Sequence, residues 1–372
     1  MKITDVSITL FEWDGFGPVV YGPTVASAAT RSTLGLVRID TDAGVSGHAF
    51  LGAAYSSATI DAQRFMDVFA PLLLGQNPLE RERLHKLMWA RVRGVSVRAL
   101  SAADIALWDL AGNHAGMPVH ALLGSYRSAI PAYISSPAHP TPQAYCDEAL
   151  AWKERGVRGY KLHIAGPWQG DVAACAAVRR AVGDGYPLML DAGWSYDYTT
   201  ALRVGRALED LDYDWFEDPL TEWDIPGYVK LRQKLDVPLM ATELPFAGLE
   251  TYSVWLTAQA TDYLRGSVAF KGGITNAIKT AHLAEAFRMN YEIHHGANSL
   301  NNVANLHVAM AIRNCDWLEV LVPEANNKWG LVEDLRIDRD GLVHAPQRPG
   351  LGVEIDFDLI RRRTLGVLRA TP

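Results

Sequence analysis

The feature that most constrains the fold of this chain is a regular alternation, over residues 126–340, of short apolar runs with longer amphipathic segments. The runs are AYISS, GYKLHIA, YPLMLDA, YDWFED, VPLMATE, RGSVAF, NYEIHH and DWLEVLV. Segments between them, such as TPQAYCDEALAWKERG and NAIKTAHLAEAFRM, are amphipathic at helical spacing. Eight strands with mostly intervening helices predict a parallel α/β barrel. A doubly wound open sheet is the alternative, but no GxGxxG follows any of the strands.

Residues 1–125 have a different pattern, which predicts a separate capping domain. Two runs of alternating apolar and polar residues, ITDVSITLFEW and LGLVRIDTDAGVSGHAFLG, predict strands, and Asp42-Ala43-Gly44 in the second predicts a hairpin turn. From about residue 57 to residue 114 the pattern is helical. The alternation that predicts the barrel covers residues 126–340 and ends there. We expect the tail at 341–372 to pack back on the first domain and to complete it.

Composition restricts the partners and the compartment. The chain has 372 residues, with 42 acidic and 35 basic side chains and a formal net charge of −7, which argues against binding to nucleic acid or to a membrane surface. No run is long enough to span a membrane, and the N-terminus lacks the apolar segment of a signal peptide. Cys146, Cys175 and Cys315 lie far apart and predict neither a disulfide framework nor a zinc site. We therefore expect a reduced, cytoplasmic protein.

Acidic residues end three successive strands of the expected barrel. Asp191, Glu217 and Glu243 are each 26 residues from the next, an interval of one strand, one helix and two loops. Successive acids should therefore lie at equivalent heights on neighbouring strands, at the carboxyl ends where barrel sites form. Oxygen ligands of this kind suit Mg²⁺, and three converging carboxylates need a counter-ion. Each acid alone can instead cap a helix or pair with a surface base, but the three in register predict a metal site.

A lysine and several histidines follow other strands of the barrel. Lys161 beside a divalent cation would have a lowered pKa and could act as a base, although a solvent-exposed lysine or a structural pair with Asp191 is the alternative. His163 shares the strand face of Lys161, and either contacts substrate or fills the barrel mouth. His294 and His295 alternate faces, so only one of them can point into the barrel.

Several of these segments together resemble one known family, the enolase superfamily in its mandelate racemase/muconate lactonizing enzyme-like branch. The resemblance covers nearly the whole chain. It includes SAADIALWDLAGNHAGMPVHALLG, GYKLHI, the acid-bearing segments LMLDAG, DWFEDPL and LMATEL, and the segments FKGGIT and PGLGVEID, in that order. Several motifs in one order are a far more specific signal than any single one of them.

The resemblance implies a modified (β/α)₇β barrel closed by an α+β cap that is built from the N-terminal segment and the C-terminal tail. It also implies a Mg²⁺-dependent enzyme that removes the proton α to a substrate carboxylate and forms an enediolate. The residues that match its metal ligands are Asp191, Glu217 and Glu243, and those that match its catalytic positions are Lys161, His295 and Glu319. Members of the family are commonly homo-oligomers, which implies a homo-oligomer here.

Substrate contacts are expected from the cap and from the barrel mouth. A Gly/Pro/Ser-rich stretch, DGFGPVVYGPTVASAATRS, is too long for a simple connection, and the resemblance implies that it is a lid. Tyr21 in this stretch and Tyr55 in LGAAYSS match the specificity loops of the family. We expect these two residues, His163 and His294 to contact a small carboxylate substrate.

Two positions depart from the pattern of the family. Many relatives have Lys-x-Lys on the second strand, whereas this chain has Lys161-Leu162-His163. Relatives also carry an Asp, or in another branch a lysine base, five residues before the Gly-Gly of the sixth strand, where this chain has Ser267. Without that carboxylate the seventh-strand histidine lacks the partner that would orient it and raise its basicity. Lys271 lies four positions further on, where we expect the strand to have ended.

These features favour dehydration of a sugar acid, with Lys161 as the base and His295 or Glu319 assisting loss of the β-hydroxide. A racemase or epimerase is an alternative that needs competent bases on both faces of the α-carbon, and Ser267 counts against that pairing. A lactone cycloisomerase shares the same first step. From other classes, the chain could be a catalytically impaired binding protein, or an aldolase that forms a Schiff base at Lys161.

Overall fold

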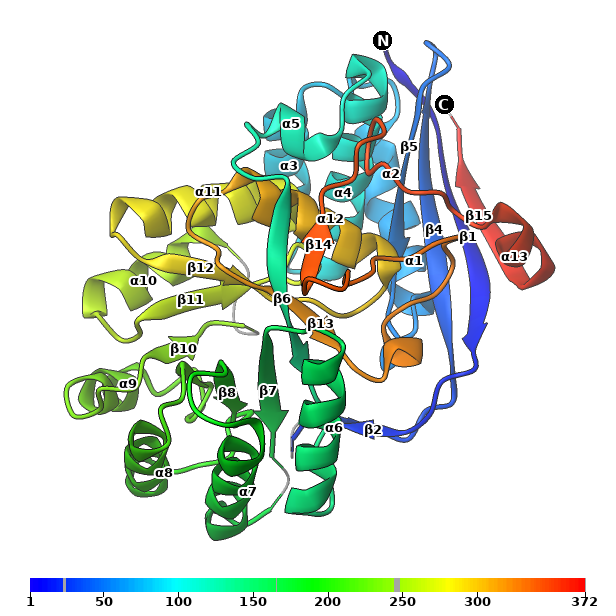
Figure 1. The fold of residues 1–372 in the computed structure, drawn as a ribbon. Coiled ribbons are helices and arrows are strands. Elements are labelled where there is room, and N and C mark those ends of the chain that lie inside the picture. Colours follow the sequence, from blue (N-terminus) through cyan, green and yellow to red (C-terminus); the bar gives the residue numbers. More distant parts are fainter. Residues whose placement is uncertain (23–24, 165, 244–247, 372) are drawn as a thin grey trace.

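Eight parallel strands form a near-closed barrel in the computed structural model, which describes residues 1–22, 25–164, 166–243 and 248–371 (Figure 1). In spatial order from β13 through β6 to β12, each strand pairs in parallel with its neighbours. The strands are β6 (Ala129–Ser135), β7 (Gly159–His163), β8 (Leu188–Asp191), β9 (Trp215–Glu217), β10 (Leu239–Ala241), β11 (Tyr263–Gly266), β12 (Asn290–Ile293) and β13 (Leu318–Leu321). The predicted α/β barrel is therefore confirmed.

Helices cover the outside of the barrel between successive strands (Figure 1). They are α6 (Pro142–Glu154), α7 (Trp168–Val182), α8 (Tyr198–Asp210), α9 (Ile225–Arg232), α10 (Leu249–Ala258), α11 (Gly273–Ala286) and α12 (Ser299–Ala311). Side-chain caps fix several of their starts: Thr141, Asp197 and Asn298 each accept a hydrogen bond from the backbone N–H three residues on. These caps hold the strand-to-helix loops, where the site residues lie.

A four-stranded antiparallel sheet forms the cap, in the order β15-β1-β4-β5. The strands are β1 (Ile3–Asp14), β4 (Arg31–Thr41), β5 (Ser46–Leu51) and β15 (Thr364–Ala370). The hairpin between β4 and β5 is confirmed, and Gly44 in its turn has a φ of 72°, a conformation that favours glycine. The long loop after β1 contains a small ribbon, β2 (Val19–Val20) paired with β3 (Ala26–Ser27). Residues 23 and 24 of this expected lid lie outside the described part of the chain.

The helical half of the cap packs between its sheet and the barrel. It consists of α1 (Thr59–Arg64), the π-helical segment η1 (Phe65–Phe69), α2 (Ala70–Leu73), α3 (Arg81–Trp89), α4 (Val97–Ala115) and α5 (Val119–Leu122). Ser96 caps the start of α4, and Gly116 ends the helix in the left-handed conformation. Gly47 allows β5 to lie directly against α4, because a Cβ at this position would overlap the carbonyl oxygen of Ala106.

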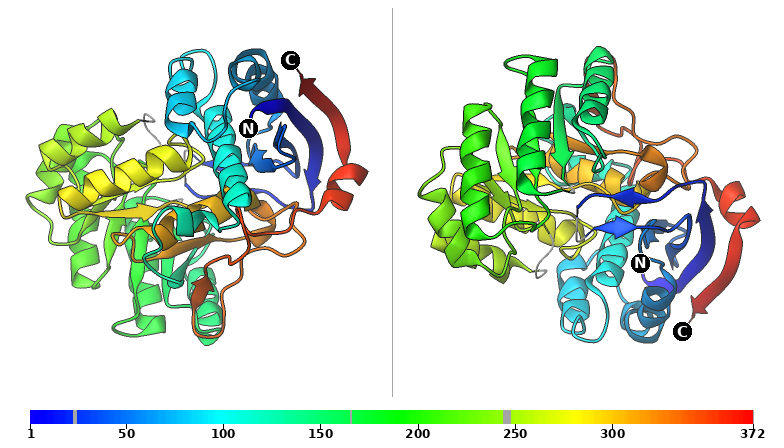
Figure 2. Two further views of the ribbon diagram at one scale, coloured as in Figure 1. Left: turned by 90° about the horizontal axis from the view of Figure 1, so that it is seen from above. Right: turned by 90° about the horizontal axis from the view of Figure 1, so that it is seen from below.

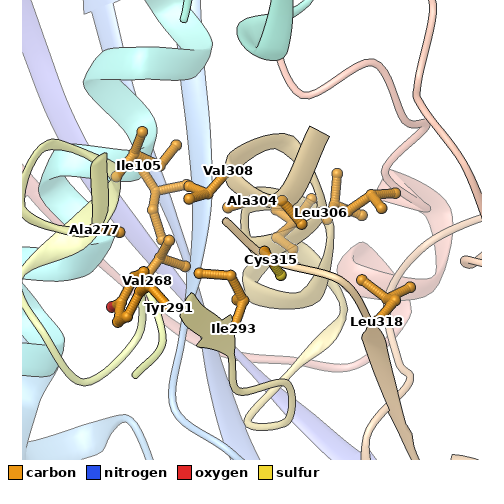
Figure 3. Packing of buried hydrophobic residues seen from close by; sticks show 14 of the residues in the cluster. Ile105, Val268, Ala277, Tyr291, Ile293, Ala304, Leu306, Val308, Cys315 and Leu318 are labelled. Atoms are coloured by element: carbon orange, nitrogen blue, oxygen red, sulfur yellow. The ribbon is translucent and has the colours of Figure 1, made fainter. Parts of the chain in front are cut away.

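One apolar core runs without interruption from the cap into the barrel. In Figure 3, Ile105 of α4 points toward Val268, which follows β11, and toward Val308 of α12. Tyr291 and Ile293 of β12 lie in the same cluster. Apolar burial stabilises such contacts by roughly 25 cal/mol per Å². The cap is therefore held on the barrel by core packing as well as by loops.

The C-terminal tail takes part in both halves of the structure. After the short turn η2 (Glu324–Asn326), β14 (Leu342–His344) pairs antiparallel with the barrel strand β6. The chain then crosses to the cap through α13 (Phe357–Arg362), and β15 pairs with β1, so that the two termini lie in the same sheet (Figure 2). The tail therefore packs on the cap as expected, but only through β15 at its end. Its first strand, β14, extends the barrel sheet instead.

The structure also describes the cysteines and the longest helices of the chain. Cys146, Cys175 and Cys315 are buried and form no disulfide. Within the described ranges, no helix is both long enough and apolar enough to cross a lipid bilayer.

Candidate active site

A cavity of about 380 Å³ lies between the carboxyl ends of the barrel strands and the cap. This volume is within the range of small-molecule sites, roughly 300–1,000 Å³. The barrel residues that line it include Lys161, His163, Asp191, Asp218, Glu243, His294 and Glu319. The cap residues that line it are Val19, Tyr21, Val25, Ala26, Ser27, Ala54, Tyr55 and Arg98. The cavity thus brings together most of the residues that the sequence singled out.

The three acids of the expected metal site converge. Asp191, Glu217 and Glu243 each offer one oxygen, and these oxygens lie within 4.8 Å of one another. Asp191 and Glu217 are register partners on β8 and β9, as the interval predicts. The partner of Glu217 on β10 is Met240, so Glu243 lies three positions higher and reaches the group from the loop. The expectation of equal heights is therefore correct for the first two acids and wrong for the third.

The backbone beside these acids adopts conformations that side-chain-bearing residues rarely take. Trp194, Asp218 and Thr242 have φ values of 64°, 44° and 84°. Such values are most unusual for a β-branched residue such as Thr242, and strain of this kind clusters at functional sites. The hydroxyl of Thr242 forms two hydrogen bonds with the backbone of Arg265, both at 3.0 Å. It accepts one from the N–H of Arg265 and donates the other to the carbonyl oxygen of Arg265. These bonds hold the turn that carries Glu243.

Lys161 is buried in the wall of the cavity and contacts three carboxylates. Its Nζ lies 2.8 Å from Oε2 of Glu217, 2.9 Å from Oε1 of Glu319 and 3.1 Å from Oδ2 of Asp191. Burial and the charge of Arg265 lower the pKa of Lys161, but the nearby carboxylates outweigh them and the pKa stands well above its usual value. A divalent cation bound to the same carboxylates would oppose this rise. The lowered pKa expected from the sequence therefore depends on the metal.

Arg265 is a site residue that the sequence reasoning missed. This fully buried side chain of β11 forms ion pairs with Glu217, with Oε2 of Glu319 at 2.6 Å and with Oε2 of Glu243 at 3.7 Å. An arginine in the middle of an otherwise apolar strand run, YLRGSVAF, was the available signal, because a buried guanidinium requires anionic partners.

The charges at the centre of the barrel fit a divalent cation. We call the acid cluster the carboxylates that contact Lys161 or Arg265, namely Asp191, Glu217, Glu243 and Glu319. Four carboxylates face two cations, which leaves two negative charges that a bound Mg²⁺ would balance. Burial raises the pKa of Glu243 well above its usual value, as expected for a carboxyl group that lacks sufficient counter-charge. The donor set and the charge both suit the ion.

The two neighbouring histidines of the seventh strand have different positions. His294 lines the cavity, with Nε2 3.3 Å from Oε1 of Glu243, whereas the ring of His295 lies against a separate small hollow. The backbone N–H of His295 donates to Oε2 of Glu319 at 3.0 Å. Since side chains alternate along a strand, Glu292 and His294 share the inner face. The resemblance matched His295 to the seventh-strand histidine, whereas the residue that lines the cavity is His294, whose pKa burial lowers well below its usual value.

The sixth strand ends earlier than its apolar run predicts. β11 stops at Gly266, so Ser267 is the first residue after the strand, and Lys271 lies beyond it as expected. The Ser267 hydroxyl and Nδ1 of His294 have no hydrogen-bond partner among the described residues, so the serine does not orient the ring. Glu243 contacts the ring instead. Burial lowers the pKa of Lys271 to about 8.

The remaining predicted contact residues lie at the cavity. Oδ2 of Asp191 lies 3.1 Å from Nε2 of His163, whose Nδ1 is 2.7 Å from the carbonyl oxygen of Ser136. Tyr21 packs edge-on against His163, and its hydroxyl donates to the carbonyl oxygen of Val322 at 2.8 Å. Tyr55 lines the cap side together with Arg98, a cation that the sequence did not single out.

Comparisons with known proteins find matches to both parts of the chain. The family model "Mandelate racemase / muconate lactonizing enzyme, N-terminal domain" matches residues 16–124, and "Enolase C-terminal domain-like" matches residues 144–359. The L-talarate/galactarate dehydratase of Salmonella typhimurium is 32% identical, over 75% of this chain and 70% of that protein. The N-succinyl-L-Arg/Lys racemase of Bacillus cereus is 28% identical, over 89% and 90%.

A solved structure extends the likeness to the fold as a whole. The D-glucarate dehydratase from Agrobacterium tumefaciens, complexed with magnesium, superposes with a TM-score of 0.88 and is 35% identical, over 98% of this chain and 100% of that one. Relatives named for different reactions, a dehydratase and a racemase, are thus both similar to this chain. The chain belongs to the enolase superfamily, in its mandelate racemase/muconate lactonizing enzyme subgroup.

Proposed function

We propose that this protein is a Mg²⁺-dependent lyase that dehydrates a sugar acid by removing the proton α to its carboxylate. The observation that carries the proposal is the contact of Lys161 with two of the three expected metal ligands. Its Nζ lies 3.1 Å from Asp191 and 2.8 Å from Glu217, so the base and the metal position share one end of the cavity. The named dehydratases among the relatives support the same reaction class.

Asp191, Glu217 and Glu243 would hold the ion. When bound, Mg²⁺ would supply positive charge to the substrate carboxylate, and so stabilise the second negative charge that develops as the enediolate forms. Asp191 also contacts His163, which keeps this ligand oriented at the cavity wall.

Lys161 takes the α-proton onto Nζ in the first step. The C–O bond at the β-carbon then breaks and a C=C bond forms, so the hydroxide must gain a proton and leave as water. The proton that Lys161 took from the α-carbon supplies the one that the hydroxide needs, so the reaction is balanced. His294 faces the same cavity, and we assign to it a hydrogen bond to the departing hydroxyl group. The resulting enol becomes a keto acid.

For Glu319 we propose a different role from the one that the sequence favoured. Both of its oxygens are engaged, by Lys161, by Arg265 and by the N–H of His295. A carboxylate held by two cations is a poor proton donor. We therefore assign Glu319 to the positioning of Lys161, and leave assistance to the leaving group with His294.

Racemisation is the second candidate function, because Lys161 and His294 both line the cavity and could serve as bases on two faces of an α-carbon. Incubation of the Mg²⁺-loaded enzyme with a panel of acid sugars in D₂O distinguishes the two. A dehydratase forms a keto acid, whereas a racemase or epimerase returns deuterated substrate of inverted configuration. A protein that neither exchanges the α-proton nor forms product with any acid would contradict both functions.

Two further assignments accompany this function. We propose that residues 1–125 and 341–372 form the capping domain and residues 126–340 the catalytic barrel; the cap sheet supports this division, although β14 pairs with β6. We also propose a homo-oligomer, on the family resemblance alone, which sedimentation velocity tests directly.

A further inference from the structure

We propose that Arg98 forms a subsite for a second anionic group of the substrate, at the end opposite the carboxylate that reacts. This inference rests on the proposed function, since it assumes that one carboxylate of the substrate is bound at the metal end of the cavity. The substrate would then carry two anionic groups, either a carboxylate at each end or a carboxylate and a phosphate; we call both kinds of acid dianions, for their two anionic groups.

Arg98 reaches the cavity from a rigid part of the cap. It is the second residue of α4, whose first turn is fixed by Ser96, with Oγ accepting the N–H of Ala99 at 3.2 Å. Most of this helix is buried between the cap sheet and α11, in the core that joins cap and barrel. A guanidinium on such an element is placed more exactly than one on a loop, which favours specific recognition.

The guanidinium of Arg98 is less engaged than the other cations near the cavity. Lys161 and Arg98 are the only lysine or arginine side chains among the described residues that line it. Lys161 is in contact with three carboxylates. The acid that Arg98 contacts is Asp61, with Nε and Oδ2 3.7 Å apart, which is longer than a hydrogen bond, and the side chain of Arg98 is 36% exposed. Its donors therefore remain available to a carboxylate or phosphate, which arginine binds in bidentate fashion.

The surroundings determine where a second anion can lie. At the barrel end, the acid cluster repels any anion beyond the one that the metal would hold. On the cap side, the wall is largely apolar, with Val19, Val25 and Ala54, and offers a single full positive charge. Tyr55 also lines the cavity: burial raises the pKa of its hydroxyl to about 12, the charge of Arg98 opposes this rise, and the charge of Glu243 adds to it. A dianion that spans the cavity would thus meet a cation at each end.

A set of six-carbon acids that differ only at the far end provides the test. D-Gluconate ends in a hydroxymethyl group, D-glucarate in a carboxylate and 6-phospho-D-gluconate in a phosphate, and the galactose-derived acids provide a second stereochemical series. Binding is measured by calorimetry with saturating Mg²⁺, for the wild type, Arg98→Met and Arg98→Lys. Arg93→Met is the matched control, because Arg93 is exposed and does not line the cavity.

We expect the wild type to bind a dianion more tightly than the matched monoanion in at least one series. Arg98→Met should weaken the dianion roughly 10- to 100-fold, the range for a hydrogen-bonded charge, and leave the monoanion unchanged. Arg98→Lys should retain part of the preference for the dianion over the monoanion, and Arg93→Met should retain all of that preference. The dianion that loses affinity identifies the group as carboxylate or phosphate. Equal binding of monoanions and dianions by the wild type, or an unchanged ratio in Arg98→Met, would overturn the proposal.

Turnover separates this proposal from the proposed function. If the bound dianion is dehydrated, Arg98→Met should raise its KM with little change in kcat, because Arg98 contacts the end that does not react. Selective binding of a dianion without α-proton exchange would refute the lyase and leave the subsite intact. Dehydration of monoanions alone, unaffected by Arg98→Met, would support the lyase and refute the subsite.

Discussion

Arg265 and Glu319 form a buried ion pair at the centre of the barrel, with Nη2 2.6 Å from Oε2. The other oxygen of Glu319 lies 2.9 Å from Nζ of Lys161, so one carboxylate bridges two cations from different strands. Burial raises the pKa of Glu319, but Arg265 and Lys161 outweigh it and hold the pKa well below its usual value. The sixth strand therefore supplies a positive charge at the centre of the barrel, and these contacts support the proposal that Glu319 positions Lys161.

Arg265→Met is expected to destabilise the fold, because it leaves Glu217 and Glu319 buried with one cation fewer. Breaking a buried ion pair from one side costs about 3–5 kcal/mol. Urea unfolding measures the change, and Arg232→Met, which removes a half-exposed pair with Asp262, is the control with an expected loss below about 1 kcal/mol. Equal losses in the two variants would show that Arg265 is not the central counter-ion.

Glu217→Gln is expected to weaken Mg²⁺ binding by at least about tenfold, since it removes one charged ligand of the group formed with Asp191 and Glu243. Calorimetric titration of the metal-free protein measures the affinity directly. Glu324→Gln, at an exposed position outside the cavity, should leave it unchanged. A metal affinity that is the same in both variants would place the ion elsewhere.

Lys161→Ala is expected to abolish exchange of the substrate α-proton with solvent deuterium, a loss of roughly 10²- to 10⁴-fold for a general base. Proton NMR in D₂O with bound Mg²⁺ follows the exchange without requiring product formation. Lys234→Ala, at an exposed position just after the end of α9, is the matched control. Exchange that persists in Lys161→Ala would assign the base to another residue.

The two adjacent histidines offer a paired test of the seventh strand. His294→Asn should reduce the rate of water loss, because this ring faces the cavity, while His295→Asn should leave kcat/KM within a few-fold. A single-turnover measurement of keto acid formation resolves the step. The reverse order of effects would restore His295 as the functional residue and contradict the observed strand phase.

Glu292 is expected to make the stability of the protein depend on pH. Burial raises the pKa of this carboxyl to about 7, although it accepts the backbone N–H groups of Asp316 and Trp317. Because the folded state holds this proton more tightly than the unfolded state, the contribution of Glu292 is largest below the unfolded pKa of about 4.3 and is lost as the pH rises toward 7. Unfolding free energies at pH 5 and pH 7 should therefore differ less in Glu292→Gln than in the wild type. The same pH dependence in both proteins would exclude Glu292 as its source.

Much of the site was predictable because it depends on local periodicity. Asp191 and Glu217 end apolar runs one βα unit apart, and parallel pairing necessarily brings such positions side by side. Lys161 and His163 share a face because side chains on a strand alternate with a period of two. The hairpin at Gly44 and the end of α4 at Gly116 follow from the conformations that glycine allows.

The sequence by itself thus determined the barrel, the order of its strands, the acid triplet and the lysine beside it. Only the tertiary structure decided which of His294 and His295 faces the cavity, since alternation gives the period of a strand but not its phase. Only it brought Arg265 against Glu319 and Arg98 over the cavity, because those contacts join strands and domains far apart in the chain. Periodicity is a property of neighbouring residues, whereas charge balance in a closed barrel is a property of the whole fold.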